Sequence, residues 1–135
     1  YLDLPGTTCG CEFGECGACS VLGDGVVINS CLVLAPQVEG RQVVTIEGIR
    51  GPDGGPNDLQ ESFIEAGAIQ CGFCTPGMVV AATVLLQKHG YPTREQIIEG
   101  ISGNLCRCTG YQQIVEAIQM TVLRRAGLPG KEGHV

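Results

Sequence analysis

The sequence predicts an α+β fold, with a β-rich N-terminal part followed by four helices. The first part of the chain is rich in glycine and carries short apolar runs, whereas from residue 58 onward apolar residues recur with helical spacing. Between them, Gly51–Asn57 is a cluster of residues that break regular structure. We therefore expect a first domain at 1–50, a linker at 51–57, a four-helix domain at 58–128 and a loose tail at 129–135.

A hairpin and a third strand are expected in the first domain. Ser20–Leu22 and Val26–Asn29 flank Gly23-Asp24-Gly25, and Asp-Gly between apolar runs is a strong hairpin signal. Gln42–Ile46 predicts a further strand, because most of its residues are β-branched.

The first two helices are predicted from their end signals. Asp58 is the expected N-cap of a helix over Leu59–Ala66. Thr75 is the expected N-cap of a second helix, since a proline follows it at the first helical position. That helix should run to about Lys88 and end at Gly90. It is apolar nearly all round, which predicts a central, buried helix.

Two shorter amphipathic helices should follow. Thr93 and Gln96 form a capping box for the third helix. Gly110 is expected to open the fourth. The expected inner face of the third helix carries Ile97, Ile98 and Ile101, and that of the fourth carries Tyr111, Val115, Ile118 and Val122.

Composition limits the classes of function. The 135 residues include three Tyr, three Phe, no Trp and 21 Gly, so few large side chains are available for a core. Such small cores commonly need disulfides or bound metal. The net charge of −6 argues against a nucleic-acid partner, and no run of 18 apolar residues could span a membrane.

Eight of the nine cysteines fall into two sets of four. The first set has the C-x4-C-x2-C spacing, with a fourth cysteine further on, that plant-type ferredoxins use to bind a 2Fe–2S cluster. The second set is a C-x2-C followed, after two expected helices, by a C-x-C. The first set is Cys11, Cys16, Cys19 and Cys31, and the second set is Cys71, Cys74, Cys106 and Cys108.

Three interpretations of these cysteines compete. A secreted disulfide scaffold is disfavoured by the odd count and by the apolar helices around the second set, so a reducing, cytoplasmic compartment is expected. Structural zinc in the second set is disfavoured by the tight C-x-C. Iron–sulfur binding is favoured, because each half of the second set precedes a helix N-terminus, and such termini attract anions. Two antiparallel helices between the halves should return the chain, so that both termini and all four cysteines meet at one site.

Three motifs carry a resemblance to a known family. They are Gly10-Cys11-Glu12-Phe13-Gly14-Glu15-Cys16-Gly17-Ala18-Cys19, Gln70-Cys71-Gly72-Phe73-Cys74-Thr75-Pro76-Gly77 and Gly103-Asn104-Leu105-Cys106-Arg107-Cys108-Thr109-Gly110-Tyr111. In this order they resemble the small iron–sulfur subunit of the molybdenum hydroxylases, the group of xanthine dehydrogenase, aldehyde oxidoreductase and carbon monoxide dehydrogenase.

The resemblance implies a fold, cofactors and partners. It implies a β-grasp ferredoxin domain with an outer 2Fe–2S cluster on the first set, then a four-helix domain with an inner 2Fe–2S cluster on the second. Gln70 and Cys108 occupy positions that contact the pterin in this family. Molybdopterin and FAD would lie on partner chains, a large molybdopterin-binding subunit and an FAD-binding subunit. The chain itself has no nucleotide-binding glycine motif.

The sequence departs from the family pattern in two places. Only ten residues precede Cys11, so we expect either a truncated, N-terminally incomplete sequence or a sheet completed otherwise. Cys9 is an additional cysteine, and the x4 spacing selects Cys11 as the ligand, which leaves Cys9 as a free thiol.

The leading functional hypothesis is an electron-transfer subunit of an oxidoreductase, without substrate chemistry of its own. Two alternatives remain. A free-standing two-cluster ferredoxin would run alone on gel filtration, although the mean hydropathy of +0.19 favours a chain with partner surface. A zinc-stabilised interaction module would be exposed by metal analysis.

Overall fold

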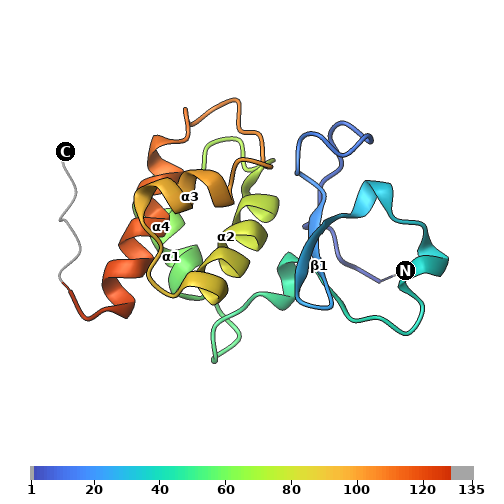
Figure 1. The fold of residues 1–135 in the computed structure, drawn as a ribbon, viewed down its shortest axis with the longest axis horizontal. Coiled ribbons are helices and arrows are strands. Elements are labelled where there is room, and N and C mark those ends of the chain that lie inside the picture. Colours follow the sequence, from blue (N-terminus) through green and yellow to red (C-terminus); the bar gives the residue numbers. More distant parts are fainter. Residues whose placement is uncertain (1, 129–135) are drawn as a thin grey trace.

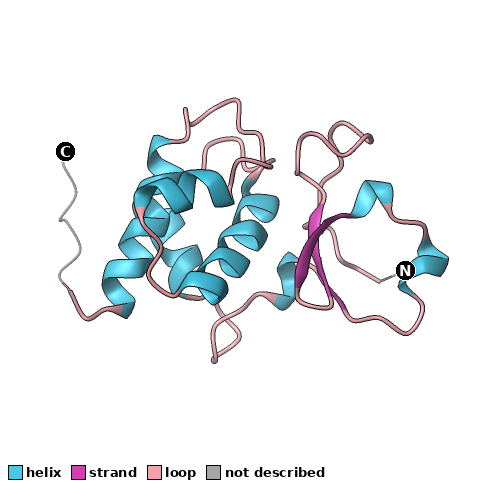
Figure 2. Cartoon of the chain, viewed as in Figure 1, coloured by secondary structure: helices cyan, strands magenta, loops and turns pink. Residues whose placement is uncertain are grey.

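The computed structural model describes residues 2–128, and the expected tail at 129–135 lies outside the described residues. The helices gather on one side of the molecule and the strands on the other (Figures 1 and 2). The strands are β1 (Ser20–Gly23), β2 (Val26–Asn29) and β3 (Val43–Val44), and the α-helices are α1 (Asp58–Glu65), α2 (Thr75–His89), α3 (Arg94–Gly100) and α4 (Gln112–Arg125). Short 3₁₀ turns cover Ser30–Leu32, Ala35–Val38 and Ile46–Gly48.

The strands form an antiparallel sheet in the order β2-β1-β3. Asp24 and Gly25 both have positive φ angles, of 50° and 81°, as the tightest hairpin turns require. The predicted hairpin is therefore confirmed. The predicted strand at 42–46 is wrong beyond Val44, because the N–H of Gly48 donates to the carbonyl of Thr45 and closes a 3₁₀ turn there.

Two helix starts differ from the prediction. Asn57, not Asp58, caps α1: its side chain accepts from the N–H of Gln60 at 2.9 Å, and the Gln60 side chain accepts from the N–H of Asn57 at 2.8 Å. Asp58 instead forms an ion pair with Arg125 in the last turn of α4. Thr75 is the first residue of α2 and not its cap.

The ends of the later helices follow the prediction more closely. Gly90 ends α2 with a φ of 64°, and Thr93 caps α3 in a capping box with Gln96. Ile98 is exposed, so its assignment to the inner face of α3 is wrong. The fourth helix begins at Gln112, after Tyr111 in the left-handed conformation.

One hydrophobic core connects the helices, and the central strand of the sheet contributes to that core. The largest fully buried side chains, led by Phe63, Leu59 and Met78, all come from the helical part. Leu22 of β1 and Ile49 join the same cluster. The sheet therefore packs on α2, the predicted central helix. No helix among the described residues is long and apolar enough to cross a membrane.

Candidate iron–sulfur sites

The hairpin brings the ends of the first cysteine set together. Cys19 directly precedes β1, and Cys31 lies in the 3₁₀ turn directly after β2. Because Ser20 pairs with Asn29 across the hairpin, residues 19 and 31 return to the same end of it. Both the N–H and the hydroxyl of Ser30 donate to the carbonyl of Cys19, at 3.3 and 2.8 Å. Cys31 therefore lies beside the loop that carries the other three cysteines of the set.

Within the first set the thiols meet in pairs. The N–H of Cys16 donates to the sulfur of Cys11 at 3.4 Å. Hydrogen bonds from the backbone N–H of Phe13, then from Cys16, lower the pKa of the Cys11 thiol to about 6. A hydrogen bond with the Cys19 thiol, with burial next, raises the pKa of Cys31. The loop therefore presents N–H groups to the sulfur of Cys11, and the thiols of Cys19 and Cys31 are hydrogen-bonded to each other.

The second cysteine set lies where two helices begin. Cys74 directly precedes α2, and Cys108 lies shortly before α4. The sulfurs of Cys71 and Cys108 are 3.4 Å apart, and the thiols of Cys74 and Cys106 share a hydrogen bond. The predicted meeting of the C-x2-C with the C-x-C is therefore present.

In each pair of the second set, one thiol has a lowered pKa and the other has a raised pKa. The N–H of Phe73, then the Cys108 thiol, lowers the pKa of Cys71, while hydrogen bonding to Cys71 raises that of Cys108. Burial, then the bond to Cys106, raises the pKa of Cys74 to about 12. Burial opposes ionisation of Cys106, but hydrogen bonds from Thr109 outweigh it and lower the pKa of that thiol. Each pair thus holds one favoured thiolate.

Thr109 and Tyr111 support the second set, and sequence reasoning gave them no site role. The Thr109 hydroxyl lies 3.1 Å from the sulfur of Cys106, and its N–H donates to the same sulfur at 3.5 Å. The N–H of Cys106 donates to the phenol oxygen of Tyr111 at 3.0 Å. Only the closeness of these residues to Cys106 in the sequence could have pointed to this role.

The arrangement of donors fits a two-iron cluster at each set. Among residues 2–128, no group of three or more His, Cys, Asp or Glu side chains is arranged to hold one metal ion. The thiols meet two by two instead, and a 2Fe–2S cluster takes its four thiolates in this way, two on each iron. None of the nine cysteines, all of them described, forms a disulfide. Cys9 is exposed beside the first set.

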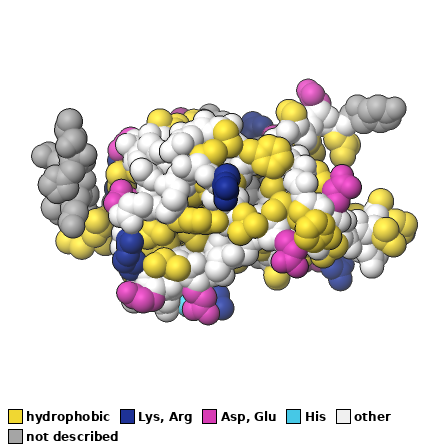
Figure 3. Space-filling model, turned by 90° about the horizontal axis from the view of Figure 1, so that it is seen from above, with side chains coloured by type: hydrophobic (Ala, Val, Ile, Leu, Met, Phe, Trp, Pro, Cys, Tyr) yellow, Lys and Arg dark blue, Asp and Glu magenta, His cyan; other side chains and the backbone are white. Residues whose placement is uncertain are grey.

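The face over the cysteine loops is apolar and exposed. In Figure 1 the loops lie along the upper edge, and the view onto that edge in Figure 3 shows hydrophobic side chains spread across it. Exposed apolar residues within two positions of a ligand in sequence are Phe13, Phe73 and Leu105. Gln70 and Cys108 are exposed as well. They are thus open to a partner molecule.

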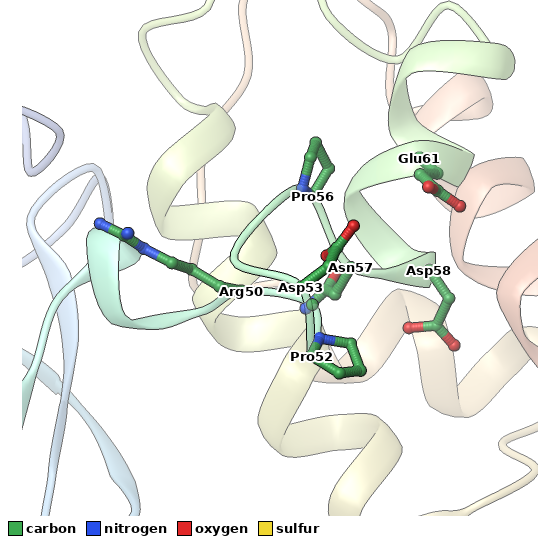
Figure 4. A pocket seen from close by; sticks show the side chains of 8 residues that line it. Arg50, Pro52, Asp53, Pro56, Asn57, Asp58 and Glu61 are labelled. Atoms are coloured by element: carbon green, nitrogen blue, oxygen red, sulfur yellow. The ribbon is translucent and has the colours of Figure 1, made fainter.

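The pocket of about 420 Å³ in Figure 4 is separate from both cysteine sets. It lies at the linker and the start of α1, and none of the described cysteines lines it. Its lining residues are Arg50, Gly51, Pro52, Asp53, Pro56, Asn57, Asp58 and Glu61.

Comparisons with known proteins agree with this geometry. Residues 45–119 match the [2Fe-2S] binding domain family. The chain is 53% identical over 115 residues to the nicotine 6-hydroxylase small subunit of Paenarthrobacter nicotinovorans, covering 85% of this chain and 68% of that protein. It is 49% identical over 111 residues to the xanthine dehydrogenase iron-sulfur-binding subunit of Escherichia coli O157:H7, covering 81% and 69%.

A solved structure is also similar. The quinoline 2-oxidoreductase structure from Pseudomonas putida 86 contains a chain that superposes with a TM-score of 0.85 at 46% identity, covering 92% of this chain and 76% of that one. The chain belongs to the family of iron–sulfur subunits of the molybdenum hydroxylases. It is thus part of an oxidoreductase.

Proposed function

We propose that this chain is the electron-transfer subunit of a molybdenum hydroxylase complex and that it holds two 2Fe–2S clusters. Electrons would pass from a molybdopterin site on a large partner chain, through the inner and then the outer cluster, toward FAD on another partner chain. The observation that carries the proposal is the gathering of eight cysteines into two sets, each composed of two thiol pairs.

The first set would hold the outer cluster and the second set the inner one. In the first, Cys11 and Cys16 would bind one iron and Cys19 and Cys31 the other. In the second, Cys71 and Cys108 would bind one iron and Cys74 and Cys106 the other. Each cluster, when bound, accepts and passes on one electron.

The chain would favour the thiolate form at three of the ligands, and metal binding would deprotonate the others. Metal binding requires deprotonated cysteines, and the N–H groups of Phe13, Phe73 and Thr109 favour that form at three of them. Cys74 and Cys19 are buried, which keeps water from one side of each set. Hydrogen bonding and burial of this kind tune cluster potentials.

The exposed face over the cysteine loops would dock on the partner chains. Gln70 and Cys108 would contact the pterin at the inner cluster, since both are exposed beside it. Large exposed apolar patches mark interaction sites, and Phe73 and Leu105 flank this one. The chain would leave substrate chemistry to the large subunit.

Other sequence expectations join the proposal. The small sheet would belong to a β-grasp ferredoxin domain at 1–50, linked through 51–57 to a four-helix domain at 58–128. The complex would be cytoplasmic, since nine cysteines without a disulfide among them suit a reducing compartment. A free-standing ferredoxin carrier is the second candidate, and gel filtration of the native material separates it from a subunit.

Metal and sulfide analysis of the native protein tests the proposal. Two clusters predict about four iron atoms and about four acid-labile sulfides per chain. About two of each, together with zinc, would mean that the second set is a zinc site. Zinc without iron would contradict the proposed function.

A further inference from the structure

Asn104 is a buried polar residue whose side chain bridges the loops of the two cysteine sets. It lies two positions before Cys106, yet it is only 4% exposed. Its side-chain amide donates to the carbonyl of Gly17 at 2.8 Å and to the hydroxyl of Ser20 at 3.2 Å. Gly17 stands between Cys16 and Cys19, 87 residues away in sequence.

A second hydrogen bond joins the same two loops at the neighbouring residues. The N–H of Leu105 donates to the carbonyl of Cys16 at 2.9 Å. Two consecutive residues of one loop, 104 and 105, are thus bonded to two consecutive residues of the other, 16 and 17. Each bond ends on a ligand or on its direct neighbour, so the two loops cannot slide past each other without breaking both.

Two glycines allow the backbones to approach closely at this crossing. A Cβ on Gly17, whose φ is +67°, would lie 2.3 Å from the carbonyl oxygen of Gly103 and 2.6 Å from the amide nitrogen of Asn104. A Cβ on Gly77, in the first turn of α2, would lie 2.3 Å from the carbonyl oxygen of Gly17. The amide of Asn104 therefore fits a closed space between three segments.

The chemistry of a buried amide explains why its position is defined. A buried amide without partners is costly, whereas one that is hydrogen-bonded stabilises a single orientation. The Gly17 carbonyl also accepts from the hydroxyl of Ser20 at 2.7 Å, so the three groups form one network. A further bridge runs from the Thr8 hydroxyl to the carbonyl of Phe73 at 2.9 Å.

We propose that Asn104 is a positioning residue that sets the separation and mutual orientation of the two cysteine sets. The inference rests on the proposed function, since it concerns the spacing of two clusters. Electron transfer and magnetic interaction between two centres both depend steeply on their separation. A network that fixes the ligand loops to each other would hold both quantities constant.

The test is low-temperature EPR of the dithionite-reduced complex, purified with its partner subunits, in which the magnetic interaction between the two reduced centres is measured. Asn104→Asp keeps the shape of the side chain and removes the donor. We expect both EPR signals to persist at full intensity. The magnetic interaction between the two centres should become weaker or more variable from molecule to molecule. Ser20→Ala removes one hydrogen-bond partner of the Asn104 amide, and it should weaken the magnetic interaction less than Asn104→Asp does.

Asn57→Ala is the matched control, because it removes another hydrogen-bonded asparagine, the cap of α1, far from the crossing in sequence. It should lower thermal stability and leave the interaction unchanged. Two full signals with an unaltered interaction in both Asn104→Asp and Ser20→Ala would overturn the inference. If Asn104→Asp yields no complex, Ser20→Ala decides alone. A single signal in the unmodified protein would contradict the two-cluster part of the proposed function instead.

Discussion

The two halves of the molecule differ in the packing that supports their cysteine sets. In the helical half, Phe63, Met78 and Ile114 are almost completely buried and form a continuous core. In the strand half, fewer apolar side chains are buried, the largest being Leu22 and Ile49, and residues such as Phe13 and Leu34 are exposed. We infer that the helical half stabilises its site through its core, whereas the strand half depends on bound metal and on contact with α2.

Removing the iron should therefore give the largest effect and separate the two halves. With a chelator under reducing conditions, we expect amide protons of residues 11–31 to exchange rapidly, because metal binding there supplies folding free energy. Amides of α2 and α4 should stay protected. Hydrogen exchange read by mass spectrometry measures both. Equal loss of protection in the two halves would show that they form one cooperative unit.

Truncating a core aromatic should come next in size. Phe63→Ala is expected to lower the free energy of unfolding by about 3–5 kcal/mol, because it leaves a cavity among α1, α2 and α4. Phe13→Ala is the matched change in the strand half, where the residue is 66% exposed, and should cost less than about 0.5 kcal/mol. Denaturant titration compares the two. A similar cost for both would contradict the contrast in packing.

Removing the Thr109 hydroxyl should shift the reduction potential of the inner cluster and leave that of the outer cluster unchanged. The hydroxyl accepts from the N–H of Tyr111 and can donate to the sulfur of Cys106, so it favours the more negative, reduced cluster. Thr109→Val should lower the inner potential by on the order of 50 mV, since about 1 kcal/mol is lost in a one-electron couple.

Thr109→Ser is the control for that measurement, since it keeps the hydroxyl and removes the methyl group. EPR-monitored redox titration should show its inner potential close to the unmodified value. A shift of the outer potential alone in Thr109→Val would mean that the two sets have been assigned to the wrong clusters.

The ion pair that links α1 to α4 should give the smallest effect. Hydrogen bonding to Arg125 lowers the pKa of Asp58, so the pair stabilises the fold above the unfolded-state pKa and this contribution is lost as pH falls through the lower, folded-state pKa. Both side chains are 40% exposed, so solvent screening limits it to less than about 1 kcal/mol.

Asp58→Asn should therefore lower the melting temperature slightly at pH 7 and make no difference in strong acid. Glu61→Gln, on the exposed side of the same helix, is the control and should be neutral at both pH values. A deficit of Asp58→Asn that grows toward acid would contradict the sign of this linkage.

Local sequence signals predicted local structure well and long-range structure less well. Asp24-Gly25 predicted the hairpin because its turn needs two residues of positive φ, and Thr93 with Gln96 predicted a cap that closes within four residues. The prediction places the cap of α1 one residue too late, because Asn57 and Asp58 are both good caps and each has a capping-box partner three residues on, Gln60 or Glu61; the structure uses Asn57 with Gln60.

The contacts of the site depended on pairs of residues far apart in the chain. Ligand spacing predicted that Cys71 and Cys108 meet, since the helices between them return the chain. Nothing in the spacing pointed to Asn104, whose partner Gly17 is 87 residues away. Val43–Val44 is the converse case: β-branched residues predicted a longer strand, and a 3₁₀ turn over Ile46–Gly48 ends it early.

The most direct test of two different iron–sulfur sites in one chain is EPR of the dithionite-reduced native protein, integrated against protein concentration. The account predicts two distinct spin-half signals, each near about one spin per chain, because each four-thiol set would bind its own 2Fe–2S cluster. One signal would leave a cysteine set without a redox centre. No signal in intact protein would contradict electron transfer as the function of the chain.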